Sequence, residues 1–181
     1  MVGGRGRQRT VASGRLSVMT VDTKNAPRRT LTFASIDDLD RDLQQIQSAI
    51  DAGTVGHTGN WTPGQICEHC AKFVRFAIDG FPSHAPGFVR FFARMFLLKK
   101  AVGPEPLEPG FQLPKQAAVM LPGNAISDAT GVAELRKEIQ RLRDGAQMTA
   151  KSPLLGPLTH DQWLVLQLKH CAMHLSFVKL S

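Results

Sequence analysis

The chain has 181 residues and 43% hydrophobic content, which is enough to bury one sizeable core but argues against two full domains. Its formal net charge of +7 belongs to the start of the chain, because residues 1–29 contain seven Lys or Arg and one acid, Asp22. From residue 30 onward, the chain contains fifteen basic and fourteen acidic residues and is nearly neutral. A nucleic-acid-binding surface needs its basic residues gathered on a folded face, so we expect no nucleic-acid partner.

The first 27 residues are rich in Gly, Arg, Ser and Thr and contain no apolar run long enough for a signal-peptide core. We expect residues 1–27 to form a disordered basic tail, with Met19 as an alternative native start, and residues 28–181 to form one domain. No apolar stretch approaches the roughly 20 residues needed to span a bilayer. Three cysteines, an odd number, do not suggest a secreted disulfide framework. Together these features predict a cytoplasmic protein.

The first two predicted helices lie before residue 80. Apolar residues after Ser35 keep returning to one helix face as far as Ile50, which predicts a helix that ends near Gly53. Thr62-Pro-Gly-Gln65 combines a capping box with Pro at the first helical position. The helix that it starts should run to about Asp79, before Gly and Pro residues interrupt the pattern.

A long crossover over residues 80–126 follows, and its segment 87–100 is helical in character. It contains four phenylalanines and four basic residues, namely Phe88, Phe91, Phe92, Phe96, Arg90, Arg94, Lys99 and Lys100. This short helix is consistent with a lid over a pocket, with a membrane-surface helix, or with packing against the other helices. We favour packing, because a longer amphipathic helix is expected for stable membrane binding, and so we expect no stable membrane association.

Two further helices are predicted after the crossover. Ser127 caps a segment whose apolar residues share one side, and Asp144-Gly145 ends it. Thr159 and Gln162 form a second capping box, and the last helix should run almost to the terminus. No strand-like alternation of useful length is present. We therefore predict an all-α fold, a four-helix bundle with one long crossover between helices two and three that carries a short extra helix.

Two histidines of the last predicted helix point the same way. His170 and His174 are four residues apart, about 40° around the helix, and lie on its apolar, core-facing stripe. Buried imidazoles require partners, and the spacing alone leaves metal ligation and simple hydrogen bonding about equally balanced. The best third ligand is His69, at the edge of the apolar face of helix two. The other histidines fall in loops or at a helix start, where solvated or capping roles are expected: His57, His84 and His160.

Three imidazoles with open coordination positions suit a catalytic divalent ion, because a structural site would be closed by four protein ligands. The Cys67-x-x-Cys70 spacing invites a redox interpretation, but Cys67 falls in the second turn of its helix, beyond the terminus that activates such thiols. We favour buried core roles for the cysteines. In metalloproteases with an HxxxH motif a Glu base follows the first His, whereas here Cys171 does, so the sequence identifies no general base.

Two regions of the chain resemble the DinB-like superfamily of DNA-damage-inducible and YfiT-type proteins. The run from Asn60-Trp61 to His69 is similar to its second-helix motif, and the runs 156–163 and 170–177 are similar to its last helix. More narrowly, Asp79-Gly-Phe-Pro, residues 110–115 and the terminal His-Leu-Ser-Phe resemble a bacterial subfamily of unknown function. The resemblance covers about residues 28–180.

This resemblance implies an up-down-down-up bundle with a divalent metal, often zinc or nickel, held by His69, His170 and His174. Characterised members of the superfamily include transferases and isomerases that use low-molecular-weight bacterial thiols such as mycothiol or bacillithiol, and others have no known activity. We therefore expect a metal-dependent enzyme, such as a thiol S-transferase acting on a small-molecule thiol. A non-catalytic metal- or ligand-binding module is the alternative. The resemblance also implies a homodimer and no DNA binding.

Overall fold

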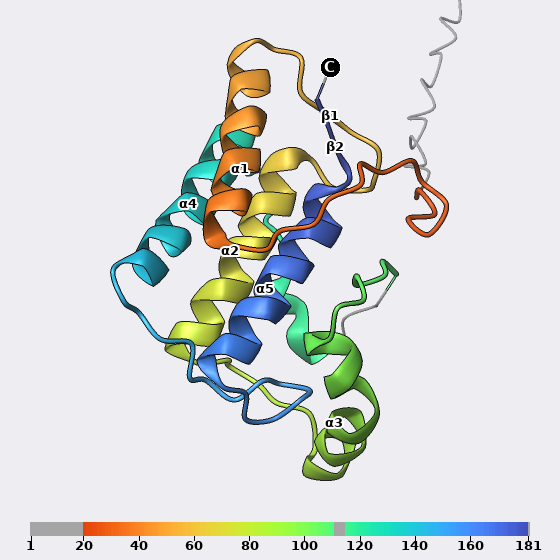
Figure 1. Ribbon diagram of the computed structural model, residues 1–181. Coiled ribbons are helices and arrows are strands. Elements are labelled where there is room, and N and C mark those ends of the chain that lie inside the picture. Colours follow the sequence, from red (N-terminus) through yellow and green to blue (C-terminus); the bar gives the residue numbers. More distant parts are fainter. Residues whose placement is uncertain (1–19, 111–114, 181) are drawn as a thin grey trace, which may run out of the picture.

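The computed structural model describes residues 20–110 and 115–180, and this part of the chain is mostly helical (Figure 1). Its elements, in chain order, are α1 (Ile36–Asp51), β1 (Gly56–His57), α2 (Pro63–Asp79), α3 (Gly87–Val102), the 3-10 helix η1 (Lys115–Met120), α4 (Asp128–Arg143), α5 (His160–Leu175) and β2 (Val178–Lys179).

The helices begin where the capping signals predict. At Ser35, Thr62 and Thr159, the N-cap hydroxyl accepts the N–H of the third helical residue, whose side chain accepts the N-cap N–H in return. These reciprocal bonds satisfy backbone donors that a helix start otherwise leaves free. Ser127 caps α4 through its hydroxyl alone. The four predicted long helices are thereby confirmed, with ends close to those expected.

Four of the helices pack around a common core. Helix α2 contacts both α4 and α5, and α1 contacts the same two helices. The apolar side chains between them are fully or almost fully buried, among them Leu43, Ile46, Ile66, Leu135, Ile139 and Leu175. This packing places α2 beside α5, the two helices that carry the predicted metal ligands (Figure 1).

Helices α2 and α4 approach each other at two glycines. A Cβ atom built on Gly131 would lie 2.1 Å from the carbonyl oxygen of Gly64, far inside van der Waals contact. The N–H of Gly64, in the first turn of α2, donates to the Asp128 carboxylate at the start of α4 (2.8 Å). Only glycine therefore permits backbone-to-backbone contact at this crossing.

A buried charge network joins the same two helices farther along. Glu138 of α4 is only 1% exposed, and its two carboxylate oxygens accept from Arg75 of α2 and Arg141 of α4, each at 2.8 Å. Arg141 also forms a bidentate pair with Asp79 at the end of α2 (2.9 and 2.6 Å). Each oxygen of the buried carboxylate thus has a charged donor, as burial of a charge requires.

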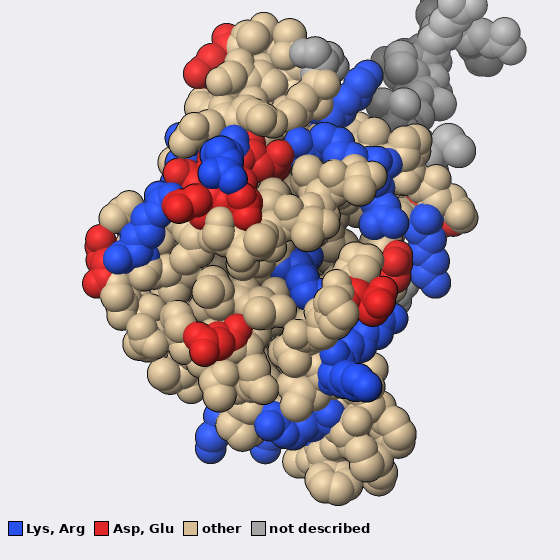
Figure 2. All heavy atoms as spheres, in the orientation of Figure 1, with Lys and Arg blue, Asp and Glu red and all other residues tan. Residues whose placement is uncertain are grey.

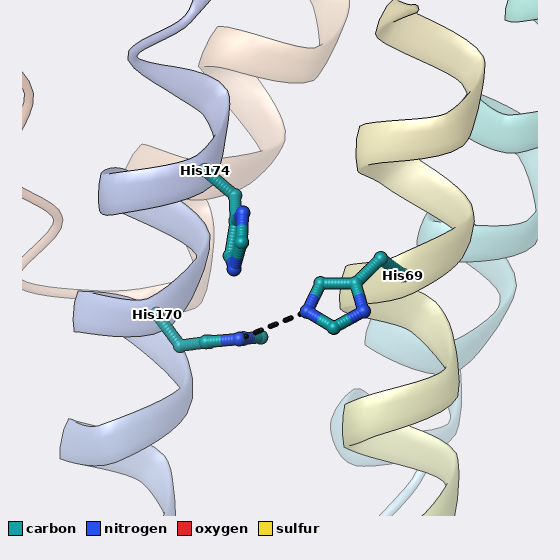
Figure 3. Close-up of side chains that lie close together, drawn as sticks. All are labelled: His69, His170 and His174. Carbon is teal, nitrogen blue, oxygen red and sulfur yellow. Dashed lines mark hydrogen bonds between the residues drawn. The ribbon is translucent and has the colours of Figure 1, made fainter. Parts of the chain in front are cut away.

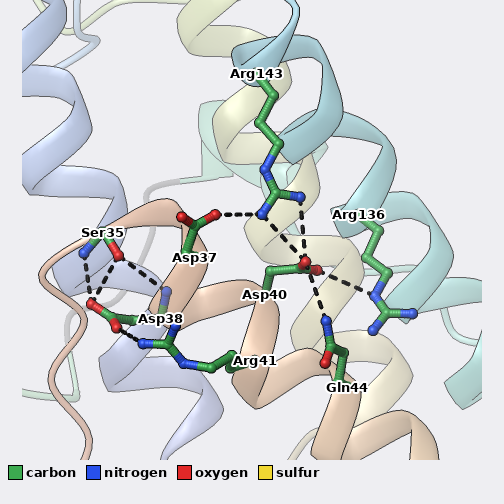
Figure 4. Close-up of polar contacts among 8 residues, drawn as sticks. All are labelled: Ser35, Asp37, Asp38, Asp40, Arg41, Gln44, Arg136 and Arg143. Carbon is green, nitrogen blue, oxygen red and sulfur yellow. Dashed lines mark hydrogen bonds and ion pairs between the residues drawn. The ribbon is translucent and has the colours of Figure 1, made fainter.

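Exposed ion pairs connect α1 with α4 (Figure 4). Arg143 donates to Asp37 (2.7 Å) and to Asp40 (3.3 Å), and Arg136 lies 3.6 Å from Asp40. Such surface pairs contribute little stability individually. They do fix which faces of α1 and α4 lie opposite each other.

The prediction of a purely helical fold missed one short strand pair. Strands β1 and β2 are antiparallel, with Gly56 opposite Lys179 and His57 opposite Val178. Each strand has two residues, too few for any alternation to be visible in the sequence. The pair ties the end of the chain to the loop between α1 and α2.

Most of the predicted tail, residues 1–19, lies outside the described residues. The part that is described is held to the loop before α2: Asn60 exchanges two hydrogen bonds with the backbone of Val21 (2.7 and 2.9 Å). Just after it, Arg29 forms a bidentate pair with buried Asp42 of α1 (2.7 and 3.0 Å) and donates to the Leu175 carbonyl (3.0 Å). This segment therefore crosses the middle of α1 and the end of α5.

The short extra helix of the crossover is confirmed as α3, but its predicted packing is wrong for all four of its aromatic side chains. Phe88, Phe91, Phe92 and Phe96 are exposed, and only Ala101, near its end, is buried. Figure 1 shows α3 at the lower right, beside the other helices rather than among them. In the described part of the chain, no helix has the length and apolarity needed to cross a membrane.

Candidate metal centre

Helices α2 and α5 bring the three predicted ligands together (Figure 3). His69 faces α5 from α2, while His170 and His174 face α2 from successive turns of α5. One ring nitrogen of each histidine lies within 4.8 Å of the others. Among residues 20–110 and 115–180, this is the only group of three or more His, Cys, Asp or Glu residues arranged to hold a metal.

The tautomer of His69 is set by a backbone carbonyl of the crossover. Its Nδ1 lies 2.7 Å from the carbonyl oxygen of Met120, which can only accept, so Nδ1 carries the proton. The Nε2 lone pair is therefore free and points toward α5. In metal-binding histidines, the ring nitrogen that does not bind the metal usually donates a hydrogen bond, which fixes the orientation of the ring.

The Nε2 lone pair of His69 faces the ring of His170. The Nε2 atoms of His69 and His170 are 3.3 Å apart (Figure 3). The Nδ1 atom of His170 is buried and has no hydrogen-bond partner among the described residues. Without a shared ligand, one imidazole has to donate to the other, and a buried polar atom remains unsatisfied at a free-energy cost.

Aromatic rings enclose the cluster. The indole of Trp61, just before α2, stacks on His174 with ring centroids 5.5 Å apart and lies 4.9 Å from the His69 ring. Phe73, one turn beyond His69, lies 4.5 Å from the His170 ring. These apolar walls exclude water from two sides and lower the local dielectric constant.

Burial keeps the three imidazoles neutral. It lowers the pKa of His69, although the bond to the Met120 carbonyl opposes the shift. Burial, followed by the charge on a neighbouring histidine, lowers the pKa of His170 and of His174 well below the usual value. A neutral imidazole is the protonation state that binds a metal ion, so the cluster is ready to bind at neutral pH.

The end of η1 and the loop after it are attached to the same face of α2. Glu68 accepts the N–H of Gly123 (2.6 Å), and Lys72 donates to the Leu121 carbonyl (2.8 Å), on either side of the bond from His69 to Met120. These two charged side chains were not expected to contribute to the site. The only signal was that Glu68 and Lys72, four residues apart, flank His69 on adjoining positions of the helix.

The cysteines are buried beside the centre and do not join it. Cys67, Cys70 and Cys171 are free thiols with no exposed surface, as predicted. Burial raises the pKa of Cys67, and a hydrogen bond to Cys171 together with burial raises that of Cys70. The thiols of Cys67 and Cys70 therefore stay protonated, which disfavours both thiolate ligation and redox exchange by this pair.

The remaining histidines lie outside the cluster. His57 bonds the Gly59 carbonyl (3.0 Å), His84 bonds the Lys151 carbonyl (3.1 Å), and His160 accepts the N–H of Met148 (3.1 Å). Each has a backbone partner outside the cluster, in keeping with the solvated or capping roles expected from their positions.

The donor set fits a divalent metal. Two nitrogens bound at about 2.0–2.1 Å to one tetrahedral zinc ion lie about 3.3 Å apart, the separation found between His69 and His170. A shared ion would also let both Nε2 atoms act as ligands and would leave the His170 Nδ1 proton free to bond water. Three protein ligands leave a further coordination position for water or substrate.

Comparison with known proteins gives a family and nothing finer. No curated protein and no solved structure matches the chain. One family model, described as a protein of unknown function (DUF1569), matches residues 25–180 and so covers all the described helices and the three clustered histidines. The chain belongs to this family, DUF1569.

Proposed function

We propose that the chain binds one divalent metal ion, zinc or nickel, through His69, His170 and His174 and is a metal-dependent enzyme of the DinB-like type. The observation that carries the proposal is the convergence of three neutral imidazole nitrogens within 4.8 Å between α2 and α5. Imidazole ligands suit both metals and do not distinguish them.

The proposed relationship extends to the fold. Helices α1, α2, α4 and α5 would form the up-down-down-up four-helix bundle of that superfamily, with α3 and η1 carried by the crossover. The contacts of α2 and of α1 with both α4 and α5 support this arrangement. The ligands would then lie between facing helices, where bundles commonly hold metals.

The chemistry follows from what surrounds the histidines. When bound, the ion would act as a Lewis acid that lowers the pKa of a thiol at the open coordination position. The Met120 carbonyl holds His69 with its Nε2 free, and Trp61 and Phe73 shield the cluster from water. Cys67 and Cys70 are buried and stay protonated, and Cys171 is fully buried, so the nucleophile would be the thiol of a small substrate.

The reaction would be transfer of an electrophilic group to that thiol. Low-molecular-weight thiols are kept reduced in the cytoplasm, which is where the proposal places the protein. The alternative is a metal- or ligand-binding module without turnover. It is favoured by the composition of the cluster, in which no carboxylate or thiol of the described residues accompanies the three imidazoles.

A conjugation assay separates the two functions. Zinc- or nickel-loaded protein is incubated with a panel of low-molecular-weight thiols and an aryl halide, and thioether formation is followed against a protein-free blank. The enzyme proposal predicts conjugation above the blank, lost in His69→Ala and kept in His84→Ala, which removes a histidine outside the cluster. Metal-loaded protein that gives only the blank rate with every thiol would favour the module.

A further inference from the structure

Helix α3 presents a continuous apolar stripe to the outside. Its members, exposed at 52–69%, are Phe88, Phe91, Phe92, Met95 and Phe96, which we call the aromatic face. They follow the spacing i, i+3, i+4, i+7, i+8, so they lie along one side of the helix. Most of the other large hydrophobic residues of the described chain are buried or partly buried.

The size of this face sets it apart from ordinary exposed residues. At about 200 Å² for each phenylalanine side chain, its four rings alone leave roughly 500 Å² of apolar surface in water. That area is in the range of the largest patch on a typical monomer, which is often a binding site. The aromatic face is therefore a candidate interaction surface.

The opposite side of α3 is anchored to the rest of the protein. Arg94 donates to the carbonyls of Leu155 and Pro157 (3.0 and 2.6 Å). Lys169 of α5 donates to the carbonyls of Lys100 and Gly103 at the end of the helix (both 2.8 Å). Ala101 is buried in an apolar cluster that also contains Leu155 and Trp163. The helix is thus held with its aromatic face turned outward.

The charges on α3 are all of one sign. The helix contains four basic residues and no acidic one, and Lys99 and Lys100 are exposed at its C-terminal end. In Figure 2 the lobe at the lower right, where Figure 1 places α3, is tan with Lys and Arg along its border. An apolar stripe bordered by cations matches the pattern of helices that lie in the surface of an anionic membrane.

A second copy of the chain fits this surface less well than an anionic membrane does. Pairing two aromatic faces would bring together two helices that each carry four positive charges and no negative one, and like charges across an interface are costly. Roughly 500 Å² of rings also falls short of the about 800 Å² per partner that stable interfaces usually bury. Charge and area therefore both favour lipid.

We propose that the aromatic face of α3 docks the protein on the surface of anionic lipid bilayers, with its rings in the interfacial region and Lys99 and Lys100 at the lipid phosphates. The helix lies on the membrane and does not cross it, in keeping with its 16 residues. The site is separate from the histidine cluster, so this inference does not depend on the proposed metal.

Co-sedimentation with vesicles tests the proposal on the full chain. Vesicles of phosphatidylcholine and phosphatidylserine in a 70:30 ratio are compared with vesicles of phosphatidylcholine alone, at about 0.1 M salt. The wild type is expected to pellet with the anionic vesicles, and Phe88→Ser/Phe92→Ser to lower its partition coefficient at least tenfold. Lys99→Gln/Lys100→Gln is expected to lower it by a similar factor on anionic vesicles only.

The matched control is Val165→Ser, which removes an exposed apolar side chain from α5 and should bind like the wild type. All the substituted side chains are exposed, so unfolding midpoints should stay unchanged. No pelleting of the wild type, or equal pelleting of the phenylalanine variant, overturns the proposal. A dimer in light scattering that Phe88→Ser/Phe92→Ser converts to a monomer also overturns it, because the face would then belong to a second copy.

Discussion

Replacing Gly131 by alanine tests how closely α2 and α4 are packed. The new Cβ would lie 2.1 Å from the Gly64 carbonyl oxygen and 2.6 Å from its Cα. These are backbone atoms of a helix, so no side chain can rotate away to make room. The two helices have to separate by about 1 Å to restore ordinary contact, which loosens the packing of Val132 and Leu135, both fully buried.

Two opposing effects set the size of the change. Alanine is favoured over glycine within a helix by about 1 kcal/mol. Overpacking a tight contact typically costs about 1–3 kcal/mol, and a clash between two helix backbones belongs at or above the top of that range. We therefore expect a net loss of about 2 kcal/mol, or a fall in Tm of about 4–8 °C for a chain of this size.

Urea unfolding followed by far-UV circular dichroism measures this loss as a lower midpoint at unchanged slope. Gly87→Ala at the start of α3 is the matched control, because no atom lies within 4 Å of the Cβ position there. It should leave stability unchanged or raise it slightly. A Gly131→Ala protein as stable as the wild type would refute the close packing of α2 on α4.

Three further predictions concern charged groups. Glu138→Ala should lower the free energy of unfolding by about 1–3 kcal/mol in urea titrations, because two guanidinium groups lose their buried acceptor; a neutral result would show that the network adds nothing. Arg29→Ala should cost about 3 kcal/mol in the same assay, since it strands the buried Asp42 carboxylate, and unchanged stability would argue against that pair. Arg141 lowers the pKa of the Asp79 carboxyl in the folded chain, so the unfolded chain binds the proton more readily. The stability that the Arg141–Asp79 pair contributes is therefore lost as pH falls below about 4. Asp79→Asn should flatten the acid decline of stability, and an equally steep decline in the variant would contradict this assignment.

The sequence signals succeeded where the structure depends on local chemistry. The reciprocal caps at Thr62 and Thr159 depend on neighbours three residues away, so they located the starts of α2 and α5 correctly. The pair His170 and His174 follows from the helical repeat alone. Its placement next to His69 required only the apolar faces of two helices to meet.

The features that could not be predicted depend on distant backbone atoms. Nothing in the sequence marks the carbonyl of Met120 as the group that orients His69, because every residue has such a carbonyl. The two-residue strands are likewise paired across more than 120 positions of the chain. The exposed aromatic face of α3 was misjudged because an apolar stripe indicates that a helix is amphipathic, not what covers it.

Metal content tests the central claim most directly. Wild-type protein loaded with excess zinc, desalted and analysed for the element is expected to retain one ion per chain, and His84→Ala should retain the same amount. His170→Ala, which removes one of the three ligands, should retain far less than one while still showing helical circular dichroism. Wild-type protein that holds no more zinc or nickel than folded His170→Ala would contradict the assignment of these three histidines as a metal centre.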